Sequence, residues 1–313
     1  MLRRNNGQTN KVSENLIGLE AFDAVAHEYD AAFSHTAVGR LLRERVWAIG
    51  STAFRPSGEG AFTPLLKPKH SVVNDAYPDG LKAVLPRVLE LNCGTGEDAI
   101  WLAKQGLQVL ATDASPEMVE IAKVKIARAG LAKSASVQVC TFAEIEHLPE
   151  GNFDLIFSNF GGLNCVSPEE LRRLGAVFAQ KLKPGGKFIA VVMGRFCWWE
   201  TLYFLLKMKP RTAFRRFDKN PVDARLDSKT TVPTWYYSPS EFKYLIRGRK
   251  PLAWRKKSKV MPIGLWLPPS YLNPFFEKRP RLLRFLNLLE KKFAPSWLAF
   301  AADHFFICSE KSH

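Results

Sequence analysis

Residues 87–106 read RVLELNCGTGEDAIWLAKQG, a short apolar run followed by a glycine-rich turn and an amphipathic segment. This order predicts a buried strand over 87–91, a tight turn, and a helix over 97–105. Glycine lacks a Cβ and accepts a positive φ, so such a turn lets the backbone approach a ligand beside a helix N-terminus. We therefore expect a nucleotide-like ligand at this turn.

The alternation of short apolar runs and helical patterns continues to residue 193. It predicts strands over 108–112, 136–140, 153–158 and 187–193, with helices over 116–129 and 168–182. Strands separated by helical patterns favour a parallel sheet covered by helices. The alternation stops after residue 195, although two later helices and a C-terminal strand in ADHFFICSEK are expected.

Charge is distributed very unevenly along the 313 residues. Residues 195–313 hold 24 Lys and Arg against 9 Asp and Glu, which accounts for the whole formal excess of +15. Residues 1–194 hold 21 of each sign, and 23 of the 37 aromatic residues lie beyond residue 194. The chain therefore combines a neutral nucleotide-binding half with a basic, aromatic-rich half.

Five scattered cysteines form no C-x-x-C pair, and the isolated histidines follow no metal-ligand spacing. Neither a disulfide framework nor a metal site is predicted. The sequence has no uncharged apolar run long enough to span a bilayer and no signal-peptide core. We expect a cytoplasmic protein, with a peripheral membrane location as an alternative.

The glycine turn alone does not decide between NAD and S-adenosylmethionine (SAM). GTGEDA, residues 94–99, fits the dinucleotide pattern, and Asp113 follows at the end of the next predicted strand. Glu90, Glu97 and Asp98 place carboxylates around the turn. These would repel the pyrophosphate of NAD and suit the sulfonium and ammonium groups of SAM. The charges favour SAM.

Four motifs in order resemble the class I (Rossmann-like) SAM-dependent methyltransferases: VLELNCGTG, VLATDAS, FDLIFSNFGGLN and LKPGGKFIAVV. An N-terminal segment, FDAVAHEYDAAF, resembles the cap of small-molecule methyltransferases of ubiquinone and menaquinone biosynthesis. The resemblance implies an α/β fold with a mixed, mostly parallel seven-stranded sheet and helices on both faces. An N-terminal helical cap and a helical, aromatic lid insertion would complete it.

The resemblance also implies a set of cofactor-binding residues. Glu90, Asn92, Gly94 and Gly96 would line the methionine side, while Asp113 would take the ribose hydroxyls. The remaining contacts would come from Tyr29 of the cap, Ser115 and Met118 beside the adenine, Phe142 and Ala143 at its amine, and Asn159 at the floor. Asn92 replaces the family's first glycine, and Asn tolerates a left-handed backbone better than most residues.

Residues for catalysis and for the acceptor are less clearly indicated. His27 of the cap is the one candidate base. Arg195, Trp198 and Trp199 directly follow the fifth strand, where they could meet an anionic group and form an apolar wall. Ordinary packing of these side chains is the alternative interpretation.

These observations predict four segments: a helical cap and linker over 1–80, a SAM-binding core over 81–194, a basic aromatic lid and substrate region over 195–300, and a core strand over 301–313. The predicted function is methyl transfer from SAM, giving S-adenosylhomocysteine (SAH), to a small-molecule, lipid-like or carrier-bound acceptor at oxygen. The basic half could face an acidic carrier protein or an anionic membrane. RNA methylation, or SAM binding without transfer, are the alternatives.

Overall fold

A seven-stranded sheet forms the centre of the computed structural model, which describes residues 21–53, 85–226, 230–248 and 253–312. Its strand order is β3–β2–β1–β4–β5–β9–β8. The strands are β1 (Arg87–Leu91), β2 (Gln108–Asp113), β3 (Ala135–Val139), β4 (Phe153–Ser158), β5 (Leu182–Met193), β8 (Lys259–Ile263) and β9 (His304–Glu310).

Strands β1 to β5 pair in parallel, and β9 runs antiparallel to both β5 and β8. The predicted mixed, mostly parallel seven-stranded sheet is therefore confirmed. The chain moves outward from β1 to β3 and then returns to β4 on the other side of β1. At such a reversal the connections leave in opposite directions, so a crevice opens at the carboxyl ends of β1 and β4.

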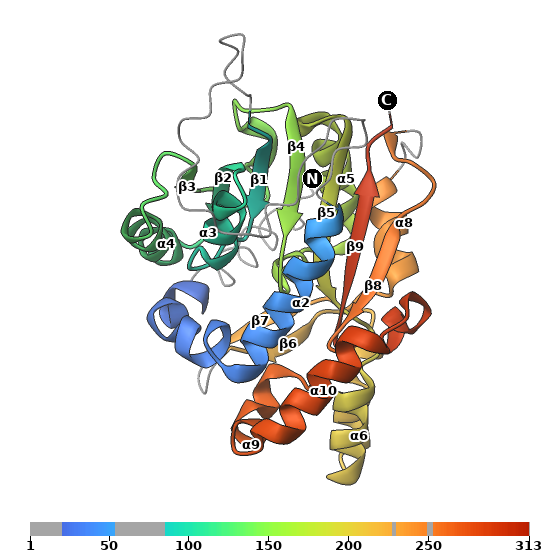
Figure 1. Cartoon of the computed structure of the whole chain (residues 1–313). Helices are drawn as coiled ribbons and strands as arrows, with labels where there is room; N and C mark the ends of the chain where they lie inside the picture. The colour runs from blue at the N-terminus through green and yellow to red at the C-terminus, as the bar shows by residue number, and fades with distance from the viewer. Residues whose placement is uncertain (1–20, 54–84, 227–229, 249–252, 313) are drawn as a thin grey trace, which may run out of the picture.

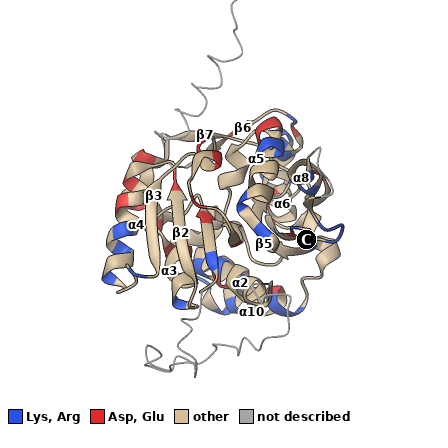
Figure 2. Cartoon of the chain, turned by 90° about the horizontal axis from the view of Figure 1, so that it is seen from above, with Lys and Arg blue, Asp and Glu red and all other residues tan. Residues whose placement is uncertain are grey.

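Helices cover both faces of the sheet (Figures 1 and 2). On one face, alternate strand residues pack against α5 (Pro168–Lys181) and α8 (Pro239–Arg247). The other face is covered by α2 (Ala37–Ala53), α3 (Glu97–Lys104), α4 (Pro116–Arg128) and α10 (Pro280–Lys292). Alternation of buried residues between two helical layers is the reason that the parallel strands read as nearly continuous apolar runs.

The segment between β5 and α8 interrupts the core pattern. It contains α6 (Trp198–Leu206), α7 (Pro210–Ala213) and a hairpin of β6 (Val222–Arg225) and β7 (Thr231–Thr234). A second excursion between β8 and β9 adds α9 (Asn273–Glu277), α10 and a short 3₁₀ segment η7 (Ser296–Ala301). The helical, aromatic-rich insertion was predicted from the sequence, but the hairpin was not.

The N-terminal cap is helical over residues 21–29, continues as the π-helical segment η1 (Asp30–Ser34), and is followed by α2. Of the predicted cap and linker over 1–80, residues 1–20 and 54–80 lie outside the described residues. Among the described helices, none combines the length and the apolar character required to cross a bilayer.

Candidate functional site

The glycine turn after β1 has the left-handed backbone that its sequence predicts. Asn92, Gly94 and Gly96 have φ values of 45°, 52° and 84°. Asn92 also ties the turn to the loop after β4, because its Nδ2 donates to the Asn159 carbonyl at 2.7 Å. A Cβ at Gly162 would lie 2.2 Å from Asn92 Cγ, so this second loop can approach only because Gly162 has no side chain.

Asp113, at the end of β2, holds the turn in place from the opposite side. Its two carboxylate oxygens accept from the backbone N–H groups of Gly94 at 2.8 Å and Ser115 at 3.0 Å. Burial raises the pKa of Asp113, and these backbone donors act in the opposite direction. Ser115 caps α4 by accepting from the Met118 N–H at 3.1 Å. Each Asp113 oxygen keeps a further lone pair for a ligand hydroxyl.

The structure corrects the expected acidic rim. Glu97 is paired with Lys125, and Asp98 is paired with the buried guanidinium of Arg43. Glu90 is 1% exposed and does not line the cavity; burial raises its pKa well above its usual range. Its Oε2 has no partner among the described residues. Most of the charge that the sequence places around the turn is therefore neutralised or buried.

Arg43, on α2, is a cation that the sequence did not single out. Besides Asp98, its guanidinium lies over the Phe160 ring, 5.3 Å from the centroid. Asp98 also accepts from Trp47 Nε1 at 2.6 Å and from Asn159 Nδ2 at 3.0 Å. The network joins the N-terminal cap to α3 and to the loop after β4. Arg43 is buried beside the apolar residues of α2 that pack in the core. Helical periodicity does not predict a buried arginine at such a position.

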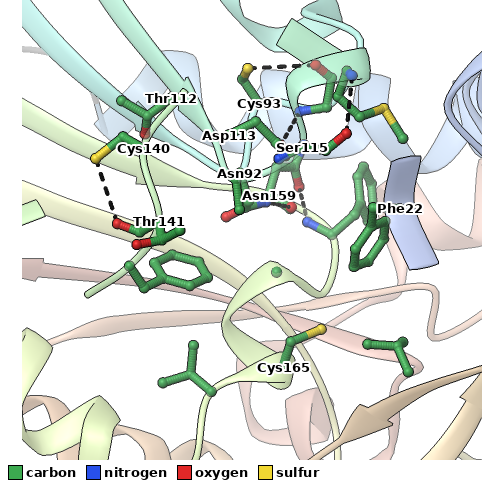
Figure 3. Close-up of a pocket in the computed structure, with 18 of the residues that line it drawn as sticks. Phe22, Asn92, Cys93, Thr112, Asp113, Ser115, Cys140, Thr141, Asn159 and Cys165 are labelled. Atoms are coloured by element: carbon green, nitrogen blue, oxygen red, sulfur yellow. Dashed lines mark hydrogen bonds between the residues drawn. The ribbon is translucent and has the colours of Figure 1, made fainter. Parts of the chain in front are cut away.

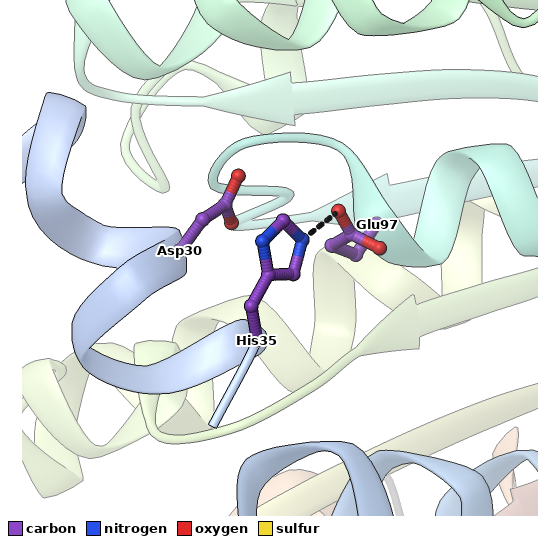
Figure 4. Close-up of side chains that lie close together, drawn as sticks. All are labelled: Asp30, His35 and Glu97. Atoms are coloured by element: carbon purple, nitrogen blue, oxygen red, sulfur yellow. Dashed lines mark hydrogen bonds and ion pairs between the residues drawn. The ribbon is translucent and has the colours of Figure 1, made fainter. Parts of the chain in front are cut away.

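A second ionic cluster fastens the cap to α3 and α4, and Figure 4 shows three of its members, Asp30, His35 and Glu97. Lys125 Nζ lies 2.8 Å from Asp30 and 2.5 Å from Glu97, and His35 Nε2 lies 3.2 Å from Glu97. Burial alone would raise the pKa of both carboxyls, but hydrogen bonds from Lys125 and its charge hold them below their usual values. Asp30, His35 and Glu97 are close enough to hold a metal ion. The Lys125 ammonium already supplies the cation between the two carboxylates.

A cavity of about 920 Å³ opens in front of these elements (Figure 3). Asp113, Ser115 and Asn92 lie on one side of it, and Cys165 lies across from them. Its polar wall comes from the loops after β1, β2 and β4. Another part of the lining is an apolar patch, from Phe142, Ile145, Cys165 and Val166 and from Val232, Pro233 and Trp235 at the hairpin. It adjoins charged residues of α5, namely Glu169, Glu170, Arg172 and Arg173.

The cavity brings together nine of the predicted cofactor residues: Tyr29, Asn92, Gly94, Asp113, Ser115, Met118, Phe142, Ala143 and Asn159. The other two, Glu90 and Gly96, do not line it. An adenosine-type ligand fits this lining, because Asp113 offers acceptors beside a backbone without a Cβ, and Met118 and Phe142 offer apolar surface. A cavity of this size also lies in the range of small-molecule sites.

The residues predicted for catalysis and for the acceptor lie elsewhere. His27 is on the surface, with its side chain 80% exposed and 3.7 Å from Glu117. Arg195 forms a bidentate pair with Glu241 at 2.7 and 2.9 Å. Trp198 donates to the Leu265 carbonyl, and Trp199 packs edge-on against Phe276. None of these four lines the cavity.

The thiols and the phenol in the lining are held in their protonated forms, whereas carboxyl groups, including those of Glu169 and Glu170 at the start of α5, also line the cavity. Burial raises the pKa of Tyr29 to about 12, that of Cys140 to about 11 and that of Cys165 to about 12. No histidine occurs among the described residues that line the cavity. The sequence analysis did not predict Trp235 and Val232 as site residues. The only local pattern around them is TTVPTWYY over 230–237, which is rich in β-branched and aromatic residues typical of a strand.

Comparison with known proteins agrees with the methyltransferase resemblance of residues 87–193. A family model described as "Methyltransferase domain" matches residues 88–186. The chain is 32% identical to the ubiquinone/menaquinone biosynthesis C-methyltransferase UbiE of Geotalea daltonii, over 61% of this chain and 71% of that protein. It is also 34% identical to the S-adenosyl-L-methionine-dependent Diels-Alderase iccD of Talaromyces variabilis, over 35% of this chain and 37% of that one.

Another relative, the uncharacterized methyltransferase sll0829 of Synechocystis, is 32% identical over 35% of this chain and 48% of its own length. The chain thus spans less than half of two of the curated relatives that it matches. Among solved structures, the DhpI–SAH complex superposes with a TM-score of 0.50 over 96% of this chain and 97% of that chain, at 16% identity. At that identity the likeness concerns the fold alone.

Proposed function

Because this chain belongs to the class I SAM-dependent methyltransferases, we propose that it transfers the methyl group of SAM to an apolar small molecule. The observation that carries the proposal is that one cavity combines the polar loops after β1, β2 and β4 with an apolar patch. The polar wall suits a nucleoside, and the apolar patch suits a lipid-like acceptor beside it.

In the proposed complex the polar wall holds the cofactor. Asp113 accepts hydrogen bonds from the ribose hydroxyls, while Gly94 and its neighbours let the methionine part approach the backbone. Ser115, Met118, Phe142 and Ala143 surround the adenine, and Tyr29 closes the site from the cap. When bound, SAM supplies an electrophilic methyl group on a sulfonium, and SAH remains after transfer.

Glu90 has a different proposed role from the one that its sequence position suggests. Its Oε2 has no hydrogen-bond partner among the described residues, and burial and the charge of Asp98 raise its pKa although Arg43 acts in the opposite direction. An ammonium group entering the cavity would favour its ionised form through charge attraction. We therefore keep Glu90 as a residue that acts on the cofactor's amino group by its charge, from behind the lining.

The apolar patch defines the class of acceptor. Val166, Val232 and Trp235 can bury a hydrocarbon or aromatic body and exclude water from the reacting oxygen. The thiols and the phenol in the lining stay protonated at neutral pH, so they do not remove a proton from an alcohol. The acceptor that we propose needs no deprotonation by these groups: it is an apolar carboxylate or an acidic phenol.

The experiment is a label-transfer screen. The protein would be incubated with SAM labelled on its methyl group and with apolar carboxylates and phenols, each beside its methyl ester or ether as a matched control. We expect label to pass to one of the anionic acceptors and not to the blocked control. Transfer only to neutral alcohols or to RNA would overturn the choice of acceptor.

A second candidate function is SAM binding without methyl transfer. The match to the SAM-dependent Diels-Alderase favours it, since that relative is named for a different reaction. The same screen separates the two functions. Retention of intact labelled SAM, together with conversion of an unsaturated compound that gains no label, would support the second candidate and exclude the first for that compound.

A further inference from the structure

An apolar surface that is rich in cations covers one end of the molecule, away from the cavity. Fourteen of the eighteen large hydrophobic side chains that are exposed in the described chain lie within residues 202–217 and 271–300. The most exposed are Met208, Leu206 and Trp297, at 87%, 76% and 71%. We call the exposed part of residues 202–219 and 271–300 the basic apolar face. None of the described residues that line the cavity belongs to it.

The segments of this face adjoin one another in space. Helices α6, α9 and α10 lie together at the lower end of the molecule in Figure 1. Tyr203 of α6 contacts Tyr271 before α9, with 6.0 Å between ring centroids. Phe196 lies between Phe217 and Phe300, at 6.2 and 6.4 Å. The exposed side chains therefore form one surface and not isolated positions.

Helix α10 shows the pattern in detail. Leu283 and Leu286 point inward and pack in the core beneath the sheet. Leu282, Phe285 and Leu288 are 39%, 54% and 47% exposed. An amphipathic surface helix normally carries polar residues on its outer side. Here the outer side is apolar as well, which marks a surface that is covered in use.

Cations accompany these apolar side chains. The basic apolar face carries ten exposed Lys and Arg residues against two exposed acids, Asp218 and Glu277. On α10, Arg281 and Lys292 fall at the same helical angle as Phe285 and Leu288, since successive residues advance by one turn per 3.6. Glu290 of the same helix is buried, where it accepts from backbone N–H groups including that of Trp266. The charge of this face is therefore strongly positive.

We propose that the basic apolar face docks the protein on an anionic lipid surface. Cations would lie against the lipid phosphates, while leucine, methionine and aromatic side chains enter the acyl boundary. The most exposed side chains argue against RNA as the partner of this face, because Leu206 and Met208 cannot stack on bases as aromatic rings do. They also decide against a purely electrostatic contact with an acidic protein, which would use the cations and leave protruding aliphatic groups in water.

The test is flotation of the whole protein with vesicles of phosphatidylcholine, with and without phosphatidylglycerol. We expect binding only to the vesicles that contain phosphatidylglycerol, and weaker binding as salt is raised. Phe285→Ser with Leu288→Ser should lower the partition coefficient about tenfold or more, because the apolar insertion is lost. Tyr244→Ser with Val124→Ser, two exposed positions outside the face, should leave it unchanged.

A matched pair of charge variants tests the second component. Arg281→Glu with Lys292→Glu should lower partitioning about tenfold or more. Lys256→Glu with Lys257→Glu alters the net charge equally, at exposed positions of another loop, and should have a much smaller effect. Retained SAM binding by every variant would show that the fold and the cavity are intact.

Absence of vesicle binding by the wild-type protein would overturn the proposal. So would equal loss for both members of either pair, because net charge or general exposure would then explain the binding. If the Phe285 and Leu288 variant alters sedimentation of the protein alone while vesicles bind nothing, the face is an interface between two copies. Retention of RNA at physiological salt without vesicle binding would assign the face to nucleic acid.

Discussion

Residues 87–193 and residues 195–300 reach the same cavity by different means. In the first region, the site residues follow directly from strand ends: the glycine turn after β1, Asp113 after β2, and Asn159 after β4. In the second, the residues that reach the cavity come from a hairpin, and the segment that carries it is fixed by buried ion pairs. Parallel-sheet topology dictates the first arrangement, whereas the second depends on particular side-chain contacts.

The largest expected effect tests how the second region is anchored. Buried Arg216 reaches Glu200 and Asp303, each at 2.7 Å, and so joins α6 to the start of β9. Arg216→Met removes the buried cation that bridges both carboxylates, leaving Glu200 with Arg215 alone and Asp303 with His304 alone, and should lower the free energy of unfolding by about 3 kcal/mol. Urea unfolding would measure it. The exposed Arg211→Met should change stability by less than about 0.5 kcal/mol.

The electrostatic effect of the network can also be seen at Asp303. Arg216 and His304 hold the pKa of this buried carboxyl below its usual value, although burial acts to raise it. A destabilisation by Arg216→Met of the size found for Arg211→Met would mean that ordinary packing, and not the charge network, holds the second region.

The next effect concerns the first region. Asp113→Ala removes the acceptor for the ribose hydroxyls and two hydrogen bonds that shape the glycine turn. SAM affinity should fall about 100-fold, since hydrogen bonds to a charged group contribute about 1.5–3 kcal/mol. Titration calorimetry would measure the dissociation constant. Glu120→Ala, at an exposed position of α4, is the control, and an Asp113→Ala affinity equal to that control would remove Asp113 from the site.

A smaller effect separates the polar wall of the cavity from its apolar patch. Trp235 belongs to the apolar patch and not to the polar wall. With an acceptor found by label transfer, Trp235→Leu should raise its KM about tenfold, as expected for lost apolar contact. SAM affinity should stay within about twofold of the wild type. A variant that weakens SAM and spares the acceptor would reverse our assignment of the wall and the patch.

The smallest effect concerns the ionic cluster of the cap. The folded-state pKa values of Asp30 and Glu97 are depressed, so their contribution to stability is present at neutral pH and is lost as pH falls through the acidic range. Lys125→Met should flatten the dependence of Tm on pH at acidic pH and lower Tm only slightly at neutral pH. Lys123→Met, whose lysine pairs with Glu120 on the surface, should keep the wild-type slope. If Tm depends on pH equally in the wild type and in Lys125→Met, the ionic cluster does not contribute to the stability at acidic pH.

The sequence predicted what periodicity and backbone conformation encode. Strand β1 and helix α3 lie within one residue of their expected bounds, and Asn92 takes the left-handed conformation expected of a glycine position. Eight of the nine proposed cofactor residues that meet at the cavity are brought there by the ends of strands β1 to β4 and the segments that follow them, and the ninth, Tyr29, comes from the N-terminal cap. Their roles in binding SAM remain predictions that the experiments above address.

Side-chain pairings between segments distant in the sequence were not predicted. The carboxylates around the glycine turn looked like a negative rim, but Arg43 and Lys125, on helices distant in the sequence, neutralise Asp98 and Glu97. Arg195 followed β5 as expected of a substrate contact, yet Glu241 of α8 pairs with it. Such pairings depend on the three-dimensional approach of separate helices, which no local pattern records.

Equilibrium titration of the wild-type protein with SAM most directly tests the claim that the cavity at the ends of β1 and β2 is a methyl-donor site. We predict one site per chain, saturable by SAM, emptied by an excess of SAH, and indifferent to NADH. A protein that binds neither SAM nor SAH, or from which NADH displaces them, would contradict it.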